Sequence, residues 1–259
     1  MATRRSLSPA LCLLLLLSFP AFATSIVAIV GDQSITIAAD GVLVGNSVET
    51  GEAVRISSCK IHCVDSICFA ASGRYNNKTI GYDVWELAKP ELYRAQIPKE
   101  VSERFKSVIA PFIPKLVAVS KKETPQPYAE WLKGRPVLAY LFAGFEGKGR
   151  PVVVSAQAML DTEGRALPIR ESFRRGKSGK IGAVLLGSNQ HIADFVKRNP
   201  TLTASAATHP SEIAERMVRM EIQASENSGR GDVGEPIAIV RLTAANGLSV
   251  ERKGACQEN

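Results

Sequence analysis

The stretch TSIVAIVGDQSITIAADG, residues 24–41, contains two apolar runs separated by the turn residues 31–33. The runs, Ser25–Val30 and Ser34–Ala39, have the length and composition of two consecutive strands. Apolar side chains occupy both alternating positions of each run. Because such strands are typical of a sheet that is covered on both faces, we expect layers packed on either side of this hairpin.

The rest of the chain alternates groups of strands with pairs of helices. Further strands are expected over residues 60–64, 67–72, 137–145, 151–159, 180–186, 236–242 and 248–252, and helices over residues 76–89, 98–116, 190–197 and 209–225. Pro90 is expected to end the first helix, and Pro111 to kink or split the second. Residues 121–136 and 170–180 are expected to be loops. The expected fold class is α+β, with two packed antiparallel sheets and helices outside both, in a single domain over residues 24–259.

The first 23 residues have the pattern of a signal peptide. Arg4 and Arg5 are basic, residues 11–19 are an apolar core, and residues 21–23, Ala-Phe-Ala, form a cleavage motif. The core is too short to span a bilayer, and no later stretch approaches the roughly 18 apolar residues that a span requires. We expect an exported protein, periplasmic or extracellular, whose mature form has no membrane segment.

Composition excludes several functional classes. The 259 residues are 45% hydrophobic and carry a formal net charge of +7, which falls to +5 when Arg4 and Arg5 leave with the signal peptide. This mild charge does not indicate a nucleic-acid partner. His62, His191 and His209 are scattered, without metal-ligand spacing to cysteines or acids. We therefore expect no metal and no cofactor.

Four of the five cysteines remain after signal cleavage, and an exported protein allows disulfides. Cys63 and Cys68 flank a predicted hairpin tip, residues 65–66, and face each other across it, where a cross-strand disulfide fits. Cys59 and Cys256 are then left to pair or to stay free. The alternative is that all four are small buried thiols.

Cleavage at the predicted motif makes Thr24 the first residue of the mature chain. A threonine with a free α-amine, whose reference pKa is about 7.7–8.0, combines a nucleophile and a base. A buried lysine favours the deprotonated hydroxyl and a carboxylate holds that lysine; Lys60 and Asp40, expected on adjacent strands, have these residue types. Gly73 allows close approach of the backbone to a developing oxyanion, and Ser188 is placed to relay the proton of the amine.

Each of these residues also has an ordinary structural explanation. Asp40 fits a turn that ends a strand, Lys60 an exposed strand position, Gly73 a turn and Ser188 a helix N-cap. Their combination with an N-terminal threonine favours a catalytic site.

Five segments of the chain together resemble proteasome β-type subunits and bacterial proteasome-like N-terminal-nucleophile (Ntn) hydrolases. These segments are residues 24–27, 37–41, 69–73, 186–188 and 234–237. It implies a four-layer αββα Ntn-hydrolase sandwich and cleavage of peptide bonds by Thr24 through an acyl-enzyme. It leaves open the assembly of a homo-oligomeric ring.

The same resemblance implies a specificity pocket with Ala71 as its floor and Leu43 as a wall, which favours apolar side chains before the scissile bond. Two departures from the family pattern stand out. The segment between Asp40 and Lys60 is longer than usual, and Asp232 lies near the position of a family aspartate with a different spacing.

The expected function is thus an exported threonine hydrolase acting on a peptide or small amide substrate. Two alternatives remain open. One is an Ntn amidohydrolase of a small amide, and the other is a catalytically silent scaffold or binding protein.

Overall fold

The computed structural model describes residues 24–46, 53–187, 189–199 and 202–256; the predicted signal peptide, residues 1–23, lies outside them. Strands from both ends of this part of the chain share one five-stranded sheet, in which every neighbouring pair is antiparallel. This first sheet has the order β12 (Gly182–Gly187), β1 (Ser25–Val30), β2 (Ser34–Ala39), β13 (Ala238–Thr243) and β14 (Gly247–Arg252).

The middle of the chain forms a second five-stranded sheet, again antiparallel throughout. Its order is β11 (Arg170–Arg175), β10 (Arg150–Ala158), β9 (Leu138–Glu146), β6 (Ile67–Gly73) and β5 (Ile61–Val64). Two short ribbons complete the strands: β3 (Val42–Asn46) with β4 (Ala53–Ser57), and β7 (Asn76–Asn77) with β8 (Tyr82–Asp83).

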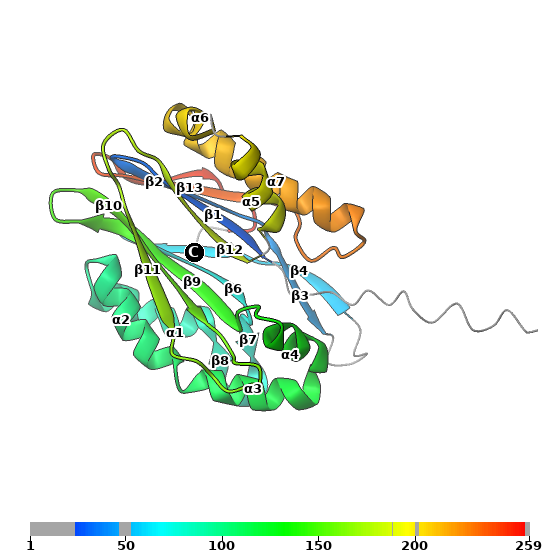
Figure 1. Cartoon of the computed structure of the whole chain (residues 1–259). Helices are drawn as coiled ribbons and strands as arrows, with labels where there is room; N and C mark the ends of the chain where they lie inside the picture. Colours follow the sequence, from blue (N-terminus) through cyan, green and yellow to red (C-terminus); the bar gives the residue numbers. More distant parts are fainter. Residues whose placement is uncertain (1–23, 47–52, 188, 200–201, 257–259) are drawn as a thin grey trace, which may run out of the picture.

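The helices lie on the outer sides of the two sheets (Figure 1). The second sheet is accompanied by the short 3-10 helix η2 (Lys78–Ile80) and by α1 (Val84–Arg94), α2 (Pro98–Ile109), α3 (Phe112–Glu123) and α4 (Pro125–Leu132). The first sheet is accompanied by α5 (Gln190–Arg198), α6 (Leu202–Thr208) and α7 (Pro210–Asn227). The expected mixture of helices with antiparallel sheets is confirmed.

The alternation of side chains along β1 explains why both faces of the first sheet are apolar. Ile26, Ala28 and Val30 belong to a buried cluster shared with strands of the second sheet. Val27 and Ile29 point the other way, into a cluster shared with α5, α6 and α7. A third cluster lies between the second sheet and α1 to α4. The prediction that the first hairpin is covered on both faces is therefore confirmed.

The first predicted helix, residues 76–89, is wrong at both ends. Its first residues form β7, η2 and β8, and α1 begins only where the Asp83 side chain accepts hydrogen bonds from the N–H groups of Trp85 and Glu86. Pro90 lies inside α1 instead of ending it. Proline has no N–H group, so Pro90 leaves the Glu86 carbonyl without its helical hydrogen bond. Because Pro90 and Glu86 are both exposed, this carbonyl lies on the solvent side of the helix.

Pro111 lies between α2 and α3, so its predicted effect as a helix breaker is confirmed as a split. Two predicted loops are wrong. Residues 121–136 contain the end of α3 and the whole of α4, and residues 170–180 contain β11. Strand β11 is exposed and charged, so only its pairing with β10 defines it as a strand.

Both pairs of cysteines form disulfides. Cys63 and Cys68 are register partners in the β5–β6 hairpin and are bonded to each other, as predicted. Cys59 is bonded to Cys256, which links the last described residues of the chain to the start of β5.

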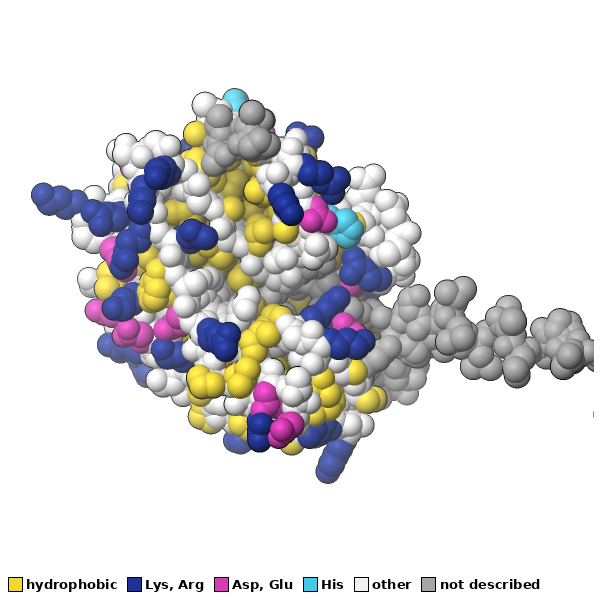
Figure 2. All heavy atoms as spheres, viewed as in Figure 1, with side chains coloured by type: hydrophobic (Ala, Val, Ile, Leu, Met, Phe, Trp, Pro, Cys, Tyr) yellow, Lys and Arg dark blue, Asp and Glu magenta, His cyan; other side chains and the backbone are white. Residues whose placement is uncertain are grey.

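Lys and Arg side chains are spread over the face shown in Figure 2, in keeping with the positive net charge. None of the helices in the described ranges has the length and hydropathy of a membrane span.

The aromatic cluster between the second sheet and helices α1 to α4 allows a quantitative test of this packing. Phe105 is fully buried and its ring packs edge-on against Phe69, Tyr140 and Phe142. We expect Phe105→Ala to lower the free energy of unfolding by about 3–5 kcal/mol, because it leaves a cavity. Tyr93, which is 68% exposed, is the matched control, and Tyr93→Ala should change that free energy by less than about 0.5 kcal/mol. Urea titration followed by circular dichroism measures both, and similar losses in the two variants would contradict this packing.

Candidate active site

The ends of four strands lie together at one end of the two packed sheets. Thr24 directly precedes β1 and Asp40 directly follows β2, and these antiparallel neighbours place both residues at the same end of the first sheet. Lys60 directly precedes β5 and Gly73 ends β6, which are antiparallel neighbours in the second sheet. The facing sheets therefore bring four predicted site residues together at the same end.

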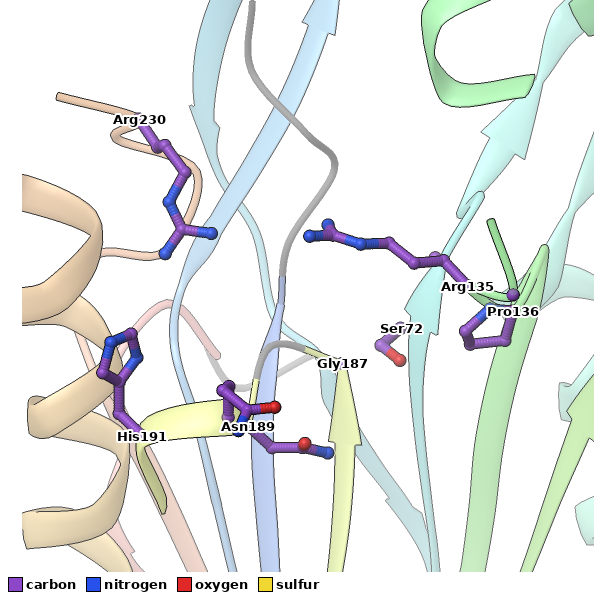
Figure 3. A pocket seen from close by; sticks show the side chains of 10 residues that line it. Ser72, Arg135, Pro136, Gly187, Asn189, His191 and Arg230 are labelled. Carbon is purple, nitrogen blue, oxygen red and sulfur yellow. The ribbon is translucent and has the colours of Figure 1, made fainter. Parts of the chain in front are cut away.

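A cavity of about 420 Å³ opens at this end of the sheets (Figure 3). Its walls come from the ends of β6 and β12, the segment after α4, the start of α5 and the segment after α7. The lining residues are Ser72, Gly73, Gly134, Arg135, Pro136, Gly187, Asn189, Gln190, His191 and Arg230.

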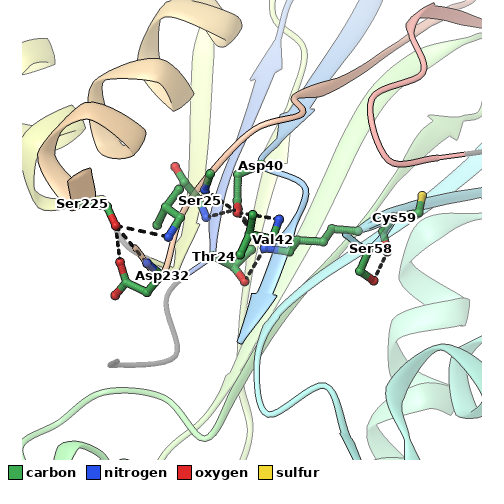
Figure 4. A network of polar contacts seen from close by, with 11 residues as sticks. Thr24, Ser25, Asp40, Val42, Ser58, Cys59, Ser225 and Asp232 are labelled. Atoms are coloured by element: carbon green, nitrogen blue, oxygen red, sulfur yellow. Dashed lines mark hydrogen bonds and ion pairs between the residues drawn. The ribbon is translucent and has the colours of Figure 1, made fainter. Parts of the chain in front are cut away.

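The central contact joins Thr24, Lys60 and Asp40, and Figure 4 labels Thr24 and Asp40 in this network. Lys60 Nζ donates a hydrogen bond to Thr24 Oγ1 at 3.0 Å and lies 2.9 Å from each carboxylate oxygen of Asp40. All three residues are buried, with at most 4% of their surface exposed. The threonine hydroxyl is thus held against an ion pair that is shielded from water.

The Asp40 carboxylate is oriented by main-chain donors from three segments. Oδ1 accepts from the N–H of Ser25 at 2.8 Å, and Oδ2 accepts from the N–H groups of Val42 at 3.2 Å and Gly234 at 3.3 Å. In return, the N–H of Asp40 donates to the carbonyl of Ser25 at 3.1 Å. Asp40 therefore fixes the backbone directly after Thr24 as well as the lysine.

Asp40 and Lys60 were expected on adjacent strands, and that placement is wrong. Asp40 follows β2 of the first sheet and Lys60 precedes β5 of the second, so the ion pair crosses between the sheets. A prediction based on chain order treats successive strands as neighbours, whereas here the β3–β4 ribbon lies between them and β5 starts a different sheet.

Burial acts on both charges of the pair. Burial lowers the pKa of the Lys60 ammonium below its ordinary value of 10.5, and the charge of Asp40 opposes this shift. Burial also raises the pKa of the Asp40 carboxyl above 3.8, against the charge of Lys60 and the N–H donors. A lysine that gives up its proton more readily than usual therefore touches the threonine hydroxyl.

Two glycines allow this close packing. A Cβ atom on Gly187 would come within 1.7 Å of the Thr24 carbonyl oxygen, and one on Gly73 within 2.5 Å of the Val137 carbonyl oxygen. Both glycines also have positive φ, +79° and +98°, which favours glycine. Gly73 lines the cavity, and its part in an oxyanion site stays a prediction.

Asp232 is buried beside this network but contacts α7. Its Oδ1 accepts a hydrogen bond from Ser225 Oγ at 2.6 Å, and Ser225 Oγ accepts from the N–H groups of Asp232 and Val233. The negative charge of Asp232 also raises the pKa of Lys60. These contacts fix the loop that carries Gly234, and a direct role of Asp232 at Thr24 stays a prediction.

The predicted specificity pocket is not found at this cavity. Side chains along β6 alternate, so Ala71 points with Phe69 into the core beneath the second sheet and is fully buried. Leu43 lies half-buried on β3, and neither Leu43 nor Ala71 lines the cavity. Ser188 lies outside the described residues.

Most residues that line the cavity were missed from the sequence, among them Ser72, Arg135 and Arg230. Ser72 precedes Gly73, and the alternation along β6 could have placed it on the face toward the first sheet. Arg135 and Arg230 each follow a glycine at the end of a helix. Their approach to one cavity depends on the packing of α4 and α7 on different sheets, which no local pattern indicates.

The described part of the chain contains no group of three or more His, Cys, Asp or Glu side chains that could hold a metal ion.

Comparison with known proteins gives a likeness of fold. No family model matches the chain, and no curated protein matches its sequence. Among solved structures, the Gly-1 mutant of Anbu from Hyphomicrobium sp. strain MC1 is similar, with a TM-score of 0.50 and 14% sequence identity over 88% of this chain and 85% of that one. At this identity the similarity shows the fold alone.

The predicted membership of the proteasome β-subunit and proteasome-like Ntn-hydrolase families is therefore wrong as a sequence assignment. No family model supports it, and the structural likeness has too little identity to carry it. The described residues of these segments lie in strands and in the turns and loops next to them, where short apolar, glycine and aspartate patterns recur for purely structural reasons.

The buried ion pair between Lys60 and Asp40 leads to a prediction about the stability of the fold. Lys60→Met leaves the Asp40 carboxylate buried without its cation, and we expect the free energy of unfolding to fall by about 3–5 kcal/mol at neutral pH. Lys106→Met is the control, because Lys106 is partly exposed in its pair with Glu171 and its loss should cost at most about 1 kcal/mol.

The pH dependence of this loss follows from Asp40. A carboxyl whose pKa is raised by folding stabilises the fold when protonated, and this contribution is lost as pH rises through the raised pKa. Lys60→Met removes the charge that opposes the rise, so its destabilisation should shrink in mildly acidic buffer. Urea titrations at neutral and acidic pH measure this, and a loss that grows on acidification would contradict the buried pair.

Proposed function

We propose that the chain is an exported hydrolase that cleaves amide bonds with Thr24 as the N-terminal nucleophile of the mature protein. The observation that carries the proposal is the 3.0 Å contact between Thr24 Oγ1 and Lys60 Nζ, inside a buried pair with Asp40. Ion pairs that are costly to bury and have shifted pKa values are frequent at catalytic sites. Removal of residues 1–23 by a signal peptidase would give Thr24 its free amine.

The proposed reaction has two halves. Thr24 Oγ bonds to the substrate carbonyl carbon while its proton passes to the α-amine, and the resulting tetrahedral intermediate collapses as the carbon–nitrogen bond breaks. The leaving amine takes up the proton from the α-amine. Water then attacks the ester of the acyl-enzyme, which releases the acid and restores the Thr24 hydroxyl.

The neighbouring groups have separate roles in this proposal. The Lys60 ammonium stabilises the negative charge that develops on Oγ1, and Asp40 positions the lysine. The main chain at Gly73, which lines the cavity, is proposed to face the oxyanion of the intermediate. Ser188 is proposed to relay the proton of the amine.

The fold is compatible with this chemistry. Two facing antiparallel sheets with helices on their outer sides support the proposal of a four-layer αββα sandwich of the Ntn-hydrolase type. The first sheet combines strands from both ends of the described chain, which supports a single domain over residues 24–259. Either a peptide or a small amide is compatible with a cavity of about 420 Å³.

Two matched variants of the full chain test the nucleophile. Thr24→Val keeps the shape of the side chain and removes the hydroxyl, and a glycine inserted before Thr24 keeps the hydroxyl and blocks the amine. We expect both to lose at least about 1,000-fold in kcat/KM, because residues that act as one nucleophilic unit fail together. Thr24→Ser, which keeps both groups, should retain measurable turnover.

The assay uses the purified, processed proteins and a library of fluorogenic peptide and small-amide substrates, with thermal unfolding as a control for folding. Wild-type turnover that survives in Thr24→Val would contradict the proposed nucleophile. Absence of turnover by a wild-type protein that begins at Thr24 would favour the silent scaffold.

A further inference from the structure

Two arginines project into the candidate active-site cavity from opposite walls (Figure 3). Arg135 follows α4, which packs on α3 and contributes Trp131 to the core beside the second sheet, and Arg230 follows α7, which packs on the first sheet. In Figure 3 their guanidinium groups point toward each other across the space above Ser72 and Gly187. None of the ten described residues that line the cavity is acidic.

The same C-terminal helix-capping motif fixes the backbone of both arginines. After α4, the N–H of Gly134 donates to the Trp131 carbonyl and the N–H of Arg135 to the Glu130 carbonyl. This is the Schellman pattern, in which a glycine with positive φ ends the helix. Pro136 further restricts Arg135 to an extended backbone.

Helix α7 ends in the same way. The N–H of Gly229 donates to the Glu226 carbonyl, and the N–H of Arg230 donates to the Ser225 carbonyl. Gly229 also has a positive φ. Each arginine therefore occupies the third position after its helix, directly after the capping glycine, on a backbone that hydrogen bonds fix.

Side-chain contacts with other described residues orient the two guanidinium groups without using all of their donors. Arg135 Nε lies 3.2 Å from Glu130 Oε2, and its side chain is 48% exposed. Arg230 Nε donates to Ser228 Oγ at 2.9 Å, and Arg230 Nη1 lies 3.8 Å from Asp232 Oδ2. A basic side chain near a helix C-terminus is common, but that preference does not explain why both point into one cavity.

Ser72 provides an independent indication of a ligand. It lines the cavity and is 2% exposed, and among the described residues its hydroxyl has no hydrogen-bond partner. A buried hydroxyl without a partner is costly and usually has a reason. A substrate oxygen in the cavity would satisfy it.

We propose that this cavity binds an amide substrate that carries a carboxylate close to the bond to be cleaved, with the carboxylate held between Arg135 and Arg230. Ser72 Oγ donates a hydrogen bond to an oxygen of the same substrate. The planar donor fork of arginine matches a carboxylate, and two positive groups at the mouth of a cavity also steer anions toward it. As a statement about the substrate, this inference rests on the proposed function.

A carboxylate can come from an acidic side chain or from the C-terminus of a peptide. Four acetylated hexapeptides separate these sources: one Glu or Gln among alanines, each with a free or an amidated C-terminus. Binding is measured by isothermal titration calorimetry on Thr24→Val protein purified from cells that express the full chain, so that turnover does not interfere.

Arg135→Gln and Arg230→Gln test the two arginines, each in the Thr24→Val background. Lys133→Gln is the matched control, because Lys133 also pairs with Glu130 but does not line the cavity. We expect one carboxylate source to bind at least about 10-fold tighter than its neutral counterpart, as charge-assisted hydrogen bonds allow. Either arginine substitution should abolish this preference, and the control should keep it.

Ser72→Ala should weaken every peptide by a similar factor and leave the preference for a carboxylate unchanged. Equal binding of acidic and neutral peptides, no binding of any peptide, or a preference that survives both arginine substitutions would overturn the inference. A carboxylate preference in a protein that never cleaves the same peptides with Thr24 intact would support the anion site and overturn the proposed hydrolase instead.

Discussion

The ion pair between Lys60 and Asp40 is the interaction on which the rest of the site depends. It joins the first sheet to the second where no strand pairing connects them, and both side chains are fully buried. Such a pair is retained only when further hydrogen bonds compensate for the loss of water. Three main-chain N–H groups on Asp40 and the Thr24 hydroxyl beside Lys60 provide that compensation.

The surrounding structure holds the pair in place from several directions. The Cys59–Cys256 disulfide ties the residue before Lys60 to the last described segment of the chain. The loop that carries Gly234 is fixed to α7 through Ser225 and Asp232. The same helix places Arg230 over the cavity, so the reactive centre and the proposed substrate-binding group share one support.

Short-range patterns predicted the parts of this fold that short-range forces determine. The strands β1 and β2, the hairpin that carries Cys63 and Cys68, and the break at Pro111 agree with the structure. Strand β11 is polar and is defined by pairing, and α4 is only eight residues long with two prolines in its first three residues, which obscure the helical spacing of Tyr128, Trp131 and Leu132. At the site, the residue types at Thr24, Asp40 and Lys60 could be chosen from chemistry, whereas the convergence of Arg135 and Arg230 depends on the packing of helices on opposite sheets.

The proposed chemistry requires that Thr24 is the first residue of the mature protein, with a free amine beside Lys60. Expression of the full chain in a host with a general secretory pathway, followed by intact-mass and N-terminal peptide mass spectrometry, identifies that residue. We expect an exported species that begins at Thr24. A mature protein that begins at any other residue, or that keeps residues 1–23, would contradict this expectation.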